Sequence, residues 1–556
     1  MSGRPLAPRA GALWAGLVLV VLALPVIAVV ALTGADTQGL WAHLANTVLS
    51  VYVTNTLLLG GGVLVLTLIT GIGTAWLVTM YEFPFRRTLE FALVLPLAMP
   101  AYILAYAYTD FFQVTGPVQT LLRDLTGLNV RDYWFPNIRS LEGAVFVLSG
   151  ALFPYVYLIT RAAFLEQSMS AVEVSRTLGL TRAQALLRVA VPMARPAIVA
   201  GGTLVTMETL ADFGAVKYFD LQTFTTGIYR AWFSYGNPAA AAQLASILLA
   251  AVFAVVLIEQ SSRGARRYAA VSAQYRDIRP WQLKGWRATL ASVACATPVG
   301  VGFAVPAIIL ISMAIDAQHD VDLARVAALT LNTGTLAAIA ATAVVALAAG
   351  VSFAAGRSQA NLLRQMSRVS ALGYATPGVV VGVGLLIVAG IADSFIRDIA
   401  EGAFHIIVGL VLSGSVAVLV YAYAVRFFAV AHGPLDAAFV RIGARYGEAA
   451  RTLGVSSSTA IIRIDIPLMR GTMLAVAALV FADVMKELPA TMILRPFNFD
   501  TLATEAFQLA TTERLDQAAL PSLAIAVAGL IPVFLLCLGL RRARPGSHGE
   551  ISVRTL

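Results

Sequence analysis

The stretch Glu173-Val-Ser-Arg-Thr-Leu-Gly-Leu180, which leads to Val191-Pro192, is the most telling part of the chain because it occurs twice. The second copy, Glu448-Ala-Ala-Arg-Thr-Leu-Gly-Val455, leads to Ile466-Pro467. The Glu, Arg, Gly and Pro positions all differ by the same 275 residues (448 − 173 and 467 − 192), so neither copy has gained or lost a residue. An ungapped repeat of a polar segment predicts two equivalent surfaces that meet two equivalent partners.

The composition around these copies indicates a membrane protein. Of the 556 residues, 59% are hydrophobic and 12% are charged, and apolar runs of bilayer-spanning length recur along the chain. We therefore predict an all-α polytopic membrane protein with about twelve transmembrane helices. The expected spans are residues 13–33, 56–79, 91–112, 142–164, 196–216, 242–259, 291–314, 332–355, 371–391, 404–425, 471–489 and 521–540.

Charge placement predicts the orientation. Most lysines and arginines lie in segments that are cytoplasmic if both termini are cytoplasmic, as the positive-inside rule expects. These segments are residues 4–9, 86–87, 161–195, 263–287, 357–368, 426–470 and 541–554. The net charge of +9 is thus spread over many short loops, which argues against a nucleic-acid partner. We expect the first span to be a retained anchor, and Cys295 and Cys537 to be packing residues.

The duplication extends beyond the opening motif. Asn55-Thr56 precedes the second expected span as Asn332-Thr333 precedes the eighth, and Pro100 matches Pro377. Each half carries six expected spans, and an even number makes the two repeats parallel. We therefore predict a first repeat at 1–260, a basic cytoplasmic linker at 261–290, a second repeat at 291–542 and a cytoplasmic tail at 543–556.

Each copy of the motif predicts a helix-turn-helix block on the cytoplasmic membrane surface. Gly179 suits a left-handed residue that ends a first helix, and Thr181 suits the cap of a second one. On that second helix we expect Arg182 and Arg188 to be exposed and Leu186 and Leu187 to be buried. Gly454 and the serines at 456–458 predict the same arrangement in the second copy. We expect Pro192 and Pro467 to set the turn into the following span.

These residues resemble the EAA loop of binding-protein-dependent ABC importer permeases. The matching positions are Glu173, Gly179, Val189, Val191 and Pro192, and again Glu448, Gly454, Ile464, Ile466 and Pro467. The second copy keeps Ala449-Ala450, whereas the first has Val174-Ser175. The resemblance covers nearly the whole chain and implies that the loops at about 168–192 and 443–467 are coupling helices that dock into an ATPase. Arg176 and Arg451 share that implied role.

The chain lacks a nucleotide site of its own. A P-loop requires Gly directly before Lys, but Lys217, Lys284 and Lys486 follow Val, Leu and Met. We therefore expect a transport subunit that is not an enzyme and has no cofactor. ATP and Mg²⁺ would be bound by two copies of a separate ATPase subunit, one for each coupling loop.

Four membrane-embedded acids are the candidate substrate path. The 275-residue offset pairs Glu208 with Asp483 and Asp212 with Glu487, and the acids of each pair are four residues apart, which predicts one helix face. Acidic side chains inside a membrane span usually face water or a partner. Together the four carboxylates would make a transient site for a hard cation, with Lys486 reducing its charge. The alternatives are a periplasmic gate or a purely structural role that includes a Lys486 ion pair.

Other candidate ligands are weaker. Tyr106 and Asp110, one helical turn apart, could extend a metal path, but tyrosines 102, 106 and 108 near a span end more often form an aromatic belt. The five histidines are too scattered along the chain for an imidazole metal site.

Longer stretches resemble fused ferric-iron permeases. They are residues 208–219, 223–233 and 486–500. The resemblance implies an inner-membrane permease that receives ferric iron from a periplasmic binding protein, docked chiefly on loops 113–141, 217–240 and 490–520. Importers of thiamine, phosphonate or polyamine remain alternatives within this class. A proton-coupled secondary transporter, also built from six plus six spans, is the alternative from a different class.

Overall fold

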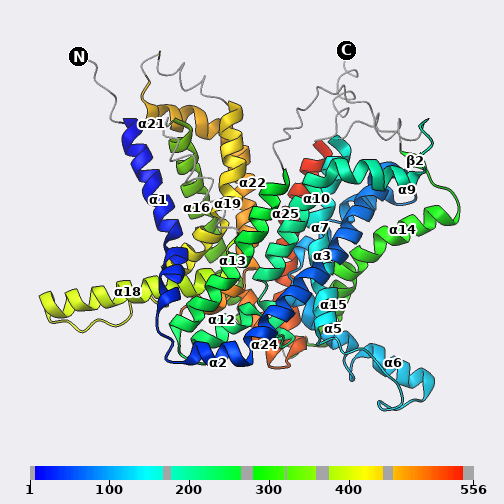
Figure 1. The fold of residues 1–556 in the computed structure, drawn as a ribbon, viewed down its shortest axis with the longest axis horizontal. Helices are drawn as coiled ribbons and strands as arrows, with labels where there is room; N and C mark the ends of the chain where they lie inside the picture. Colours follow the sequence, from blue (N-terminus) through cyan, green and yellow to red (C-terminus); the bar gives the residue numbers. More distant parts are fainter. Residues whose placement is uncertain are drawn as a thin grey trace. The chain divides into compact units, whose positions relative to one another are not determined.

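The computed structural model describes residues 7–166, 177–263, 280–317, 319, 322–357, 375–442, 452 and 455–542. Within these residues the chain is mostly helical, as predicted (Figure 1). Eleven helical segments are long and apolar enough to cross a membrane. A twelfth forms if the segments Arg86–Ala98 and Ala101–Thr126, bent by 95° at the break between them, count as one span. The prediction of about twelve spans is confirmed.

Several predicted boundaries were wrong. The ninth and tenth spans, expected at 371–391 and 404–425, correspond to helices Gly378–Phe404 and Val416–Val440. Asp393, which lies beyond the expected end of the ninth span at residue 391, is inside this helix and only 1% exposed. Its carboxylate accepts hydrogen bonds from the backbone N–H groups of Val411, Leu412 and Ser413 at 2.7–3.0 Å, so the returning loop folds back onto the helix.

The described chain forms two compact units that mix segments of both sequence halves. Unit 1 comprises residues 1–50, 224–250 and 322–505, and unit 2 comprises residues 51–223, 251–321 and 506–556. These units follow packing, whereas the repeat boundaries follow sequence similarity, so the predicted halves 1–260 and 291–542 stay a prediction. Three of the described helices have residues in both units: α3 (Leu49–Met80), α13 (Pro238–Arg263) and α24 (Leu502–Thr511).

Unit 1 is built from long helices that pack against one another. Its elements are α1 (Ala7–Ala31), η1 (Leu32–Gly34), α2 (Leu40–Thr47), α12 (Phe224–Phe233), α16 (Leu323–Arg357), α18 (Gly378–Phe404), α19 (Val416–Ile442), α21 (Ser457–Ala460), η6 (Ile461–Asp465), α22 (Ile466–Met485) and α23 (Pro489–Leu494). Helix α16 packs against α19 and α22, while α1 packs against α18, which extends beyond it in Figure 1. A Cβ at Gly384 would lie 2.3 Å from the Pro25 carbonyl oxygen, so the α1–α18 crossing requires glycine there.

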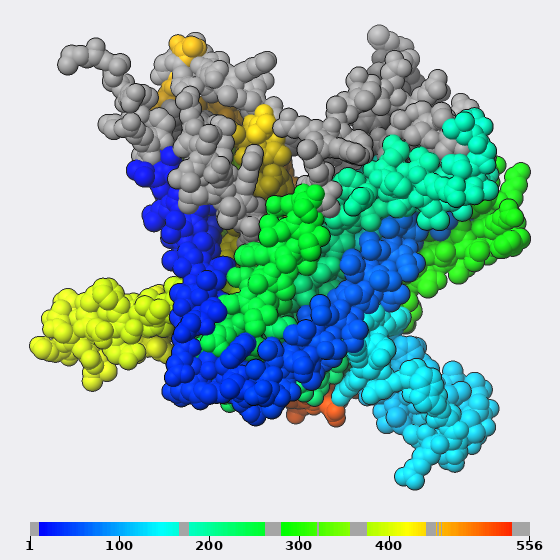
Figure 2. Space-filling view, viewed as in Figure 1, coloured from blue at the N-terminus to red at the C-terminus, as the bar shows by residue number. Residues whose placement is uncertain are grey.

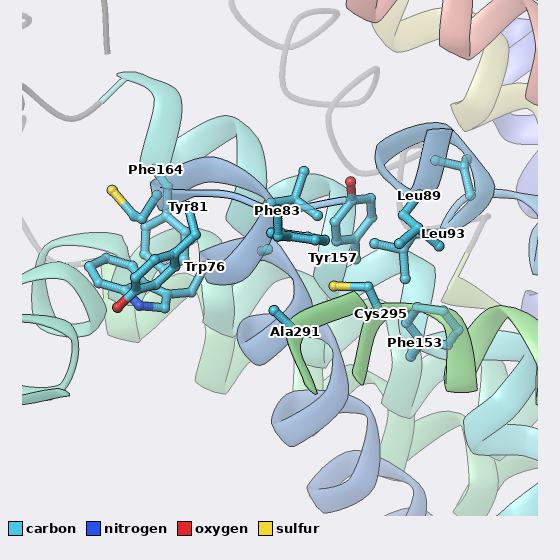
Figure 3. Close-up of a cluster of buried hydrophobic side chains, with 14 of the residues drawn as sticks. Trp76, Tyr81, Phe83, Leu89, Leu93, Phe153, Tyr157, Phe164, Ala291 and Cys295 are labelled. Carbon is cyan, nitrogen blue, oxygen red and sulfur yellow. The ribbon is translucent and has the colours of Figure 1, made fainter. Parts of the chain in front are cut away.

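Unit 2 has a large aromatic core. Its elements are α3 (Leu49–Met80), β1 (Tyr81–Glu82), α4 (Arg86–Ala92), η2 (Leu95–Ala98), α5 (Ala101–Phe112), α6 (Pro117–Thr126), α7 (Leu141–Glu166), α9 (Arg182–Ala185), η3 (Leu186–Ala190), α10 (Val191–Ala211), α11 (Gly214–Tyr218), β2 (Trp281–Gln282), α14 (Trp286–Val299), η4 (Gly300–Ala304), α15 (Val305–Asp316) and α25 (Leu515–Arg542). Figure 3 shows Trp76, Tyr81 and Phe164 at one end of the core and Tyr157 above Cys295 of α14. These rings pack closely against one another, as in the edge-to-face pair of Trp76 and Phe164 at 5.6 Å, and this packing stabilises the unit.

A short parallel pairing joins two distant segments of unit 2. Tyr81 pairs with Trp281 and Glu82 with Gln282. The second strand belongs to the segment expected to be a cytoplasmic linker, so the described end of that linker is tied to the loop after α3.

Three π-helical turns precede prolines at a constant spacing. The turns Leu186–Ala190, Gly300–Ala304 and Ile461–Asp465 end two residues before Pro192, Pro306 and Pro467. Proline lacks an N–H and its ring clashes with the carbonyl four residues earlier, and a widened turn accommodates both defects without breaking the helix. The prediction that Pro192 and Pro467 set a turn into the span was therefore wrong. Helices run continuously through both, over Arg182–Ala211 and Ile461–Met485.

Many large apolar side chains are exposed on the long helices. Examples are Leu13 and Leu17 of α1 and Leu57 and Ile69 of α3, which are 63–75% exposed. Exposed apolar surface of this extent marks an interaction with lipid or protein. Figure 2 shows the region around α6 standing out from the rest of unit 2.

Candidate substrate path and coupling segments

Asp212 does not share a helix face with Glu208. Helix α10 contains Glu208 and ends at Ala211, and Asp212 adopts an extended conformation (ψ 132°). The Asp212 carboxylate accepts hydrogen bonds from the backbone N–H groups of Ala215 and Val216, both at 3.1 Å. It therefore caps the short helix α11, a position that the partial positive charge of a helix N-terminus favours.

Glu487 plays the same local role in the second copy. Helix α22 ends at Met485, so Glu487 also lies beyond the helix that holds Asp483. Its two carboxylate oxygens accept hydrogen bonds from the backbone N–H groups of Ala490 and Thr491, both at 3.0 Å. Asp212 and Glu487 thus bind the amides three and four residues ahead, and the prediction of one helix face for each acid pair was wrong for both copies.

Glu487 is also held by a cation. Its side chain is buried and lies 3.0 Å from the Arg426 guanidinium. The Thr491 hydroxyl lies 2.6 Å from its second oxygen and 2.7 Å from the Tyr423 hydroxyl. A buried carboxylate with this many partners is a structural brace more than an open ligand.

Gly378 leaves room for this brace. A Cβ built at Gly378 would lie 2.1 Å from Arg426 Nη1 and 3.0 Å from Glu487 Oε1. A larger residue at this first position of α18 would therefore require the Arg426 guanidinium to move away from its present position.

Asp483 and Lys486 form an ion pair of their own. Lys486 Nζ lies 2.9 Å from Asp483 Oδ1, three residues earlier, and both side chains are partly exposed. The Lys486 ion pair anticipated as a structural alternative thus exists, but within one helix end.

The four acids are divided between the units. Glu208 and Asp212 belong to unit 2, and Asp483 and Glu487 belong to unit 1. Among the residues that the structure describes, no three His, Cys, Asp or Glu side chains are grouped to hold a metal ion. The four-carboxylate site remains a prediction.

The tyrosines of α5 are buried. Tyr102, Tyr106 and Tyr108 are 1–5% exposed, so the aromatic-belt interpretation was wrong. Tyr108 donates a hydrogen bond to the Val301 carbonyl at 2.6 Å, whereas the Tyr106 hydroxyl has no hydrogen-bond partner among the described residues. Asp110 accepts a hydrogen bond from Gln113 at 3.2 Å.

The first predicted coupling segment, at about 168–192, is described from Thr177 onward. Gly179 has φ +90°, the left-handed conformation that the sequence predicted. Thr181 and Gln184 form a reciprocal capping box at the start of α9, with hydrogen bonds of 2.9 and 3.3 Å. Glu173 and Arg176 lie outside the described residues, and so do Glu448, Arg451 and Gly454 of the second segment, where Ser456 accepts a hydrogen bond from the Thr459 N–H.

Side-chain directions after the cap differ from the prediction. Leu187, expected to be buried, is 67% exposed. Arg182, expected to be exposed, is half-buried, with its guanidinium 5.7 Å from the Tyr81 ring centroid and 5.2 Å from that of Trp281. The π-helical turn that starts at Leu186 changes the angular spacing of the side chains, which a regular helical pattern misses.

Sequence reasoning missed two arginines that pair with buried acids. Arg161 pairs with Glu90 inside the aromatic core of unit 2, both at most 3% exposed, and Arg426 pairs with Glu487. The charge pattern predicts both arginines to lie in cytoplasmic segments, 161–195 and 426–470. The acids Glu90 and Glu487 were the available signal for these ion pairs. A carboxylate within an apolar segment requires a cation or several hydrogen-bond donors.

Three predicted docking loops contain residues that meet in unit 2. Arg139 donates to the Tyr218 hydroxyl at 3.3 Å, its guanidinium lies 5.2 Å from that ring centroid, and it approaches Glu513 to 4.0 Å. Burial raises the pKa of Tyr218 above its ordinary value against the opposing effect of Arg139, so the phenol stays protonated. A cavity of about 580 Å³ adjoins Arg139 between residues 109 and 139.

Comparison with known proteins identifies the class. Residues 67–267 match the family described as binding-protein-dependent transport system inner membrane component. The chain is 24% identical over 486 residues to the Fe(3+)-transport system permease protein FbpB 2 of Haemophilus influenzae, covering 87% of this chain and 88% of that protein. It is 28% identical to the Escherichia coli sulfate permease CysT over 33% of this chain and 64% of CysT. It is 26% identical to the Escherichia coli molybdenum permease ModB over 34% of this chain and 82% of ModB.

The family match sets aside the secondary-transporter alternative. Permeases of this family are transport subunits and not enzymes, and their ATPase is a separate subunit that works with a periplasmic binding protein. The apolar helices agree with a multi-pass protein of the inner membrane. Residues 67–267 therefore carry the inner-membrane domain of binding-protein-dependent transport systems, and most of the chain is similar to a permease of such an ABC importer.

Proposed function

We propose that this permease imports ferric iron delivered by a periplasmic ferric-iron-binding protein. The observation that carries the proposal is the similarity to the Haemophilus Fe(3+) permease across nearly the whole length of both chains. The sulfate and molybdenum permeases match about a third of this chain. A hard trivalent cation also suits a path that contains acids, because carboxylate oxygens are hard ligands.

In the proposed assembly, two ATPase copies bind the two coupling segments on the cytoplasmic side. Both chain termini are cytoplasmic, and the binding protein docks on loops 113–141, 217–240 and 490–520. The contacts of Arg139 with Tyr218 and Glu513 support a continuous docking surface, because they link residues of all three loops within unit 2.

Transport proceeds in this proposal by alternating access. Closure of the ATPase pair on ATP moves the two coupling segments, and the path opens alternately to each side. The left-handed Gly179 and the capping box at Thr181 give the first segment a defined turn through which such a movement is transmitted.

Uptake of radioactive iron tests the substrate. A strain that lacks this permease should lose ATP-dependent uptake of ⁵⁵Fe(III), and the wild-type gene should restore it. Excess sulfate or molybdate should leave that uptake unchanged. Restoration of sulfate or molybdate uptake, with iron uptake unaffected by the deletion, would establish the oxyanion function that the CysT and ModB matches favour as the second candidate.

The acids are tested separately. A Glu208→Ala/Asp483→Ala variant should lose most iron uptake while inserting normally in the membrane. Uptake at the wild-type rate would remove these two acids from the proposed path.

A further inference from the structure

A groove opens between three helical segments of unit 2. Helices α3, α7 and α14 with its π-helical extension η4 enclose a space of about 460 Å³. Residues that line it include Leu66, Ile69, Gly73, Phe153, Pro298 and Val301. The hydroxyls of Thr74 and Thr297, also in the lining, donate to carbonyls of their own helices. The groove therefore presents mainly carbon.

The groove continues an exposed apolar surface. Leu66 and Ile69 of α3 are 43% and 66% exposed, and Leu290 and Val293 of α14 are 57% and 53% exposed. Both helices belong to candidate membrane spans. Surface of this kind on a membrane span faces lipid tails, so the groove is open to the bilayer interior.

A basic and aromatic corner lies at one end of the same helices. Its members, which we call the basic corner, are Phe85, Arg87, Lys284, Trp286 and Arg287, all exposed. The Phe85 and Trp286 side chains are 76% and 71% exposed, and the Arg287 guanidinium lies 5.6 Å from the Trp286 ring centroid. Exposed tryptophan and arginine at the end of a span are typical of the headgroup level of a membrane.

The corner is held together by specific contacts. Strands β1 and β2 pair just before Phe83 and Leu283, and Ser292 of α14 donates to the Pro84 carbonyl at 2.9 Å. Arg86 is already neutralised by Glu82 at 2.8 Å, and it also donates to the Val78 carbonyl. The free cationic groups at the corner are thus those of Arg87, Lys284 and Arg287, as far as the described residues extend.

The spacing between corner and groove matches one leaflet. Trp286 at the corner and Pro298 in the groove are 12 residues apart on helix α14 (298 − 286). The distance between them along the helix axis is about 18 Å, at 1.5 Å per residue. Half of the hydrocarbon core is about 15 Å. A lipid with its headgroup at the corner would therefore place an acyl chain in the groove.

We propose that the basic corner and the groove together form a binding site for an anionic phospholipid of the cytoplasmic leaflet. Charge complementarity selects the headgroup, since basic pockets beside membrane spans on the cytoplasmic side bind anionic headgroups. The apolar groove selects an acylated ligand over free phosphate. The proposal rests on the predicted orientation, which places residues 84–87 and 284–287 on the cytoplasmic side.

Native mass spectrometry of the purified full-length permease tests the site. The protein is equilibrated in detergent with equal amounts of phosphatidylglycerol and phosphatidylcholine, and the first bound lipid is identified. We expect wild type to retain phosphatidylglycerol about tenfold over phosphatidylcholine. Arg87→Gln/Lys284→Gln/Arg287→Gln should bring this ratio close to one. Arg397→Gln/Arg463→Gln/Arg470→Gln, which removes three exposed arginines elsewhere, should preserve it.

Two glycines of α3 provide a matched test of the groove. A Cβ added at Gly73 or at Gly61 meets no neighbouring atom within 4 Å, so we expect both Gly73→Leu and Gly61→Leu to leave the protein folded. Only Gly73 lines the groove. Gly73→Leu should lower retention of both lipids severalfold, and Gly61→Leu should leave retention unchanged.

Four results would overturn the proposal. They are an unchanged lipid ratio in the triple corner variant, an equal loss in the triple control, equal effects of the two glycine variants, and displacement of the lipid by glycerol phosphate. Loss of ATPase association with an unchanged lipid ratio would assign the corner to a protein partner instead.

Discussion

Asp212 and Glu487 stand at equivalent places in the repeated sequence, yet their surroundings differ. Each caps a short helix by accepting hydrogen bonds from the amides three and four residues ahead. Glu487 is buried and pairs with Arg426 at 3.0 Å, whereas the Asp212 side chain is partly exposed. In the first copy, residues 149–151, which offsets of 277 to 275 place opposite Arg426, are Ser, Gly and Ala. Both copies thus share the cap, whereas the burial of the capping acid differs between them.

The glycine next to the ion pair follows the same logic. Gly378 leaves room for Arg426, and its equivalent, 277 residues earlier, is Ala101 (378 − 101). Where the first copy has no arginine, a Cβ is tolerated. The glycine and the arginine thus occur together in the second copy. This pairing indicates that they serve the structure of that copy and not a transport function common to both.

The largest expected effect is that of Arg426→Ala. Removing the arginine leaves Glu487 buried without its cation, which costs about 3–5 kcal/mol. The free energy of unfolding, measured by SDS titration in mixed micelles, should fall by that amount. Glu487→Gln in the same background should recover part of it, because the charge is removed. A loss below about 1 kcal/mol would mean that Arg426 only rests at the surface of the brace.

Gly378→Ala should have the next largest effect. The added Cβ overlaps the Arg426 guanidinium, and overpacking of this kind costs about 1–3 kcal/mol. In the Arg426→Ala background the same substitution should cost much less, since the two residues share one space. Additive losses in this double-mutant cycle would contradict the explanation of the glycine.

Asp212→Ala should cost about 0.5–2 kcal/mol, the usual price of losing a helix cap. Asp212→Asn keeps an oxygen acceptor and should retain most of the stability. Hydrogen exchange at the Ala215 and Val216 amides provides the direct readout. Exchange that is equally slow in Asp212→Ala would show that the cap does not hold α11.

The smallest effect belongs to Ala101→Gly. It gives the first copy the glycine of the second, with no arginine to make room for, so the change should stay within about 1 kcal/mol. A thermal unfolding scan beside Gly378→Ala measures the contrast. If the two substitutions shifted the midpoint equally, the difference between the copies would have another cause.

Sequence predicted the class of fold because hydropathy and charge bias act over twenty residues or more. The repeat offset also led to Asp212 and Glu487. Their role as caps was not predictable, since the ends of α10 and α22 at Ala211 and Met485 fall inside apolar runs. The same limit hid Asp393, whose three backbone donors arrive from residues 411–413.

The π-helical turns were missed for a related reason. A pattern of period 3.6 assumes one spacing throughout, and the turns before Pro192 and Pro467 depart from it. The exposure of Leu187 follows from the course of the helix through the π-helical turn. The packing of Arg182 depends on Trp281, which belongs to a strand about a hundred residues further along the chain.

Reconstitution tests the central claim most directly. The permease is placed in proteoliposomes with its ATPase, and the ferric-iron-loaded binding protein is added outside with ATP inside. The account predicts ATP-dependent accumulation of ⁵⁵Fe that is abolished without the ATPase and unaffected by sulfate or molybdate. Accumulation of sulfate or molybdate, with iron at background, would contradict it.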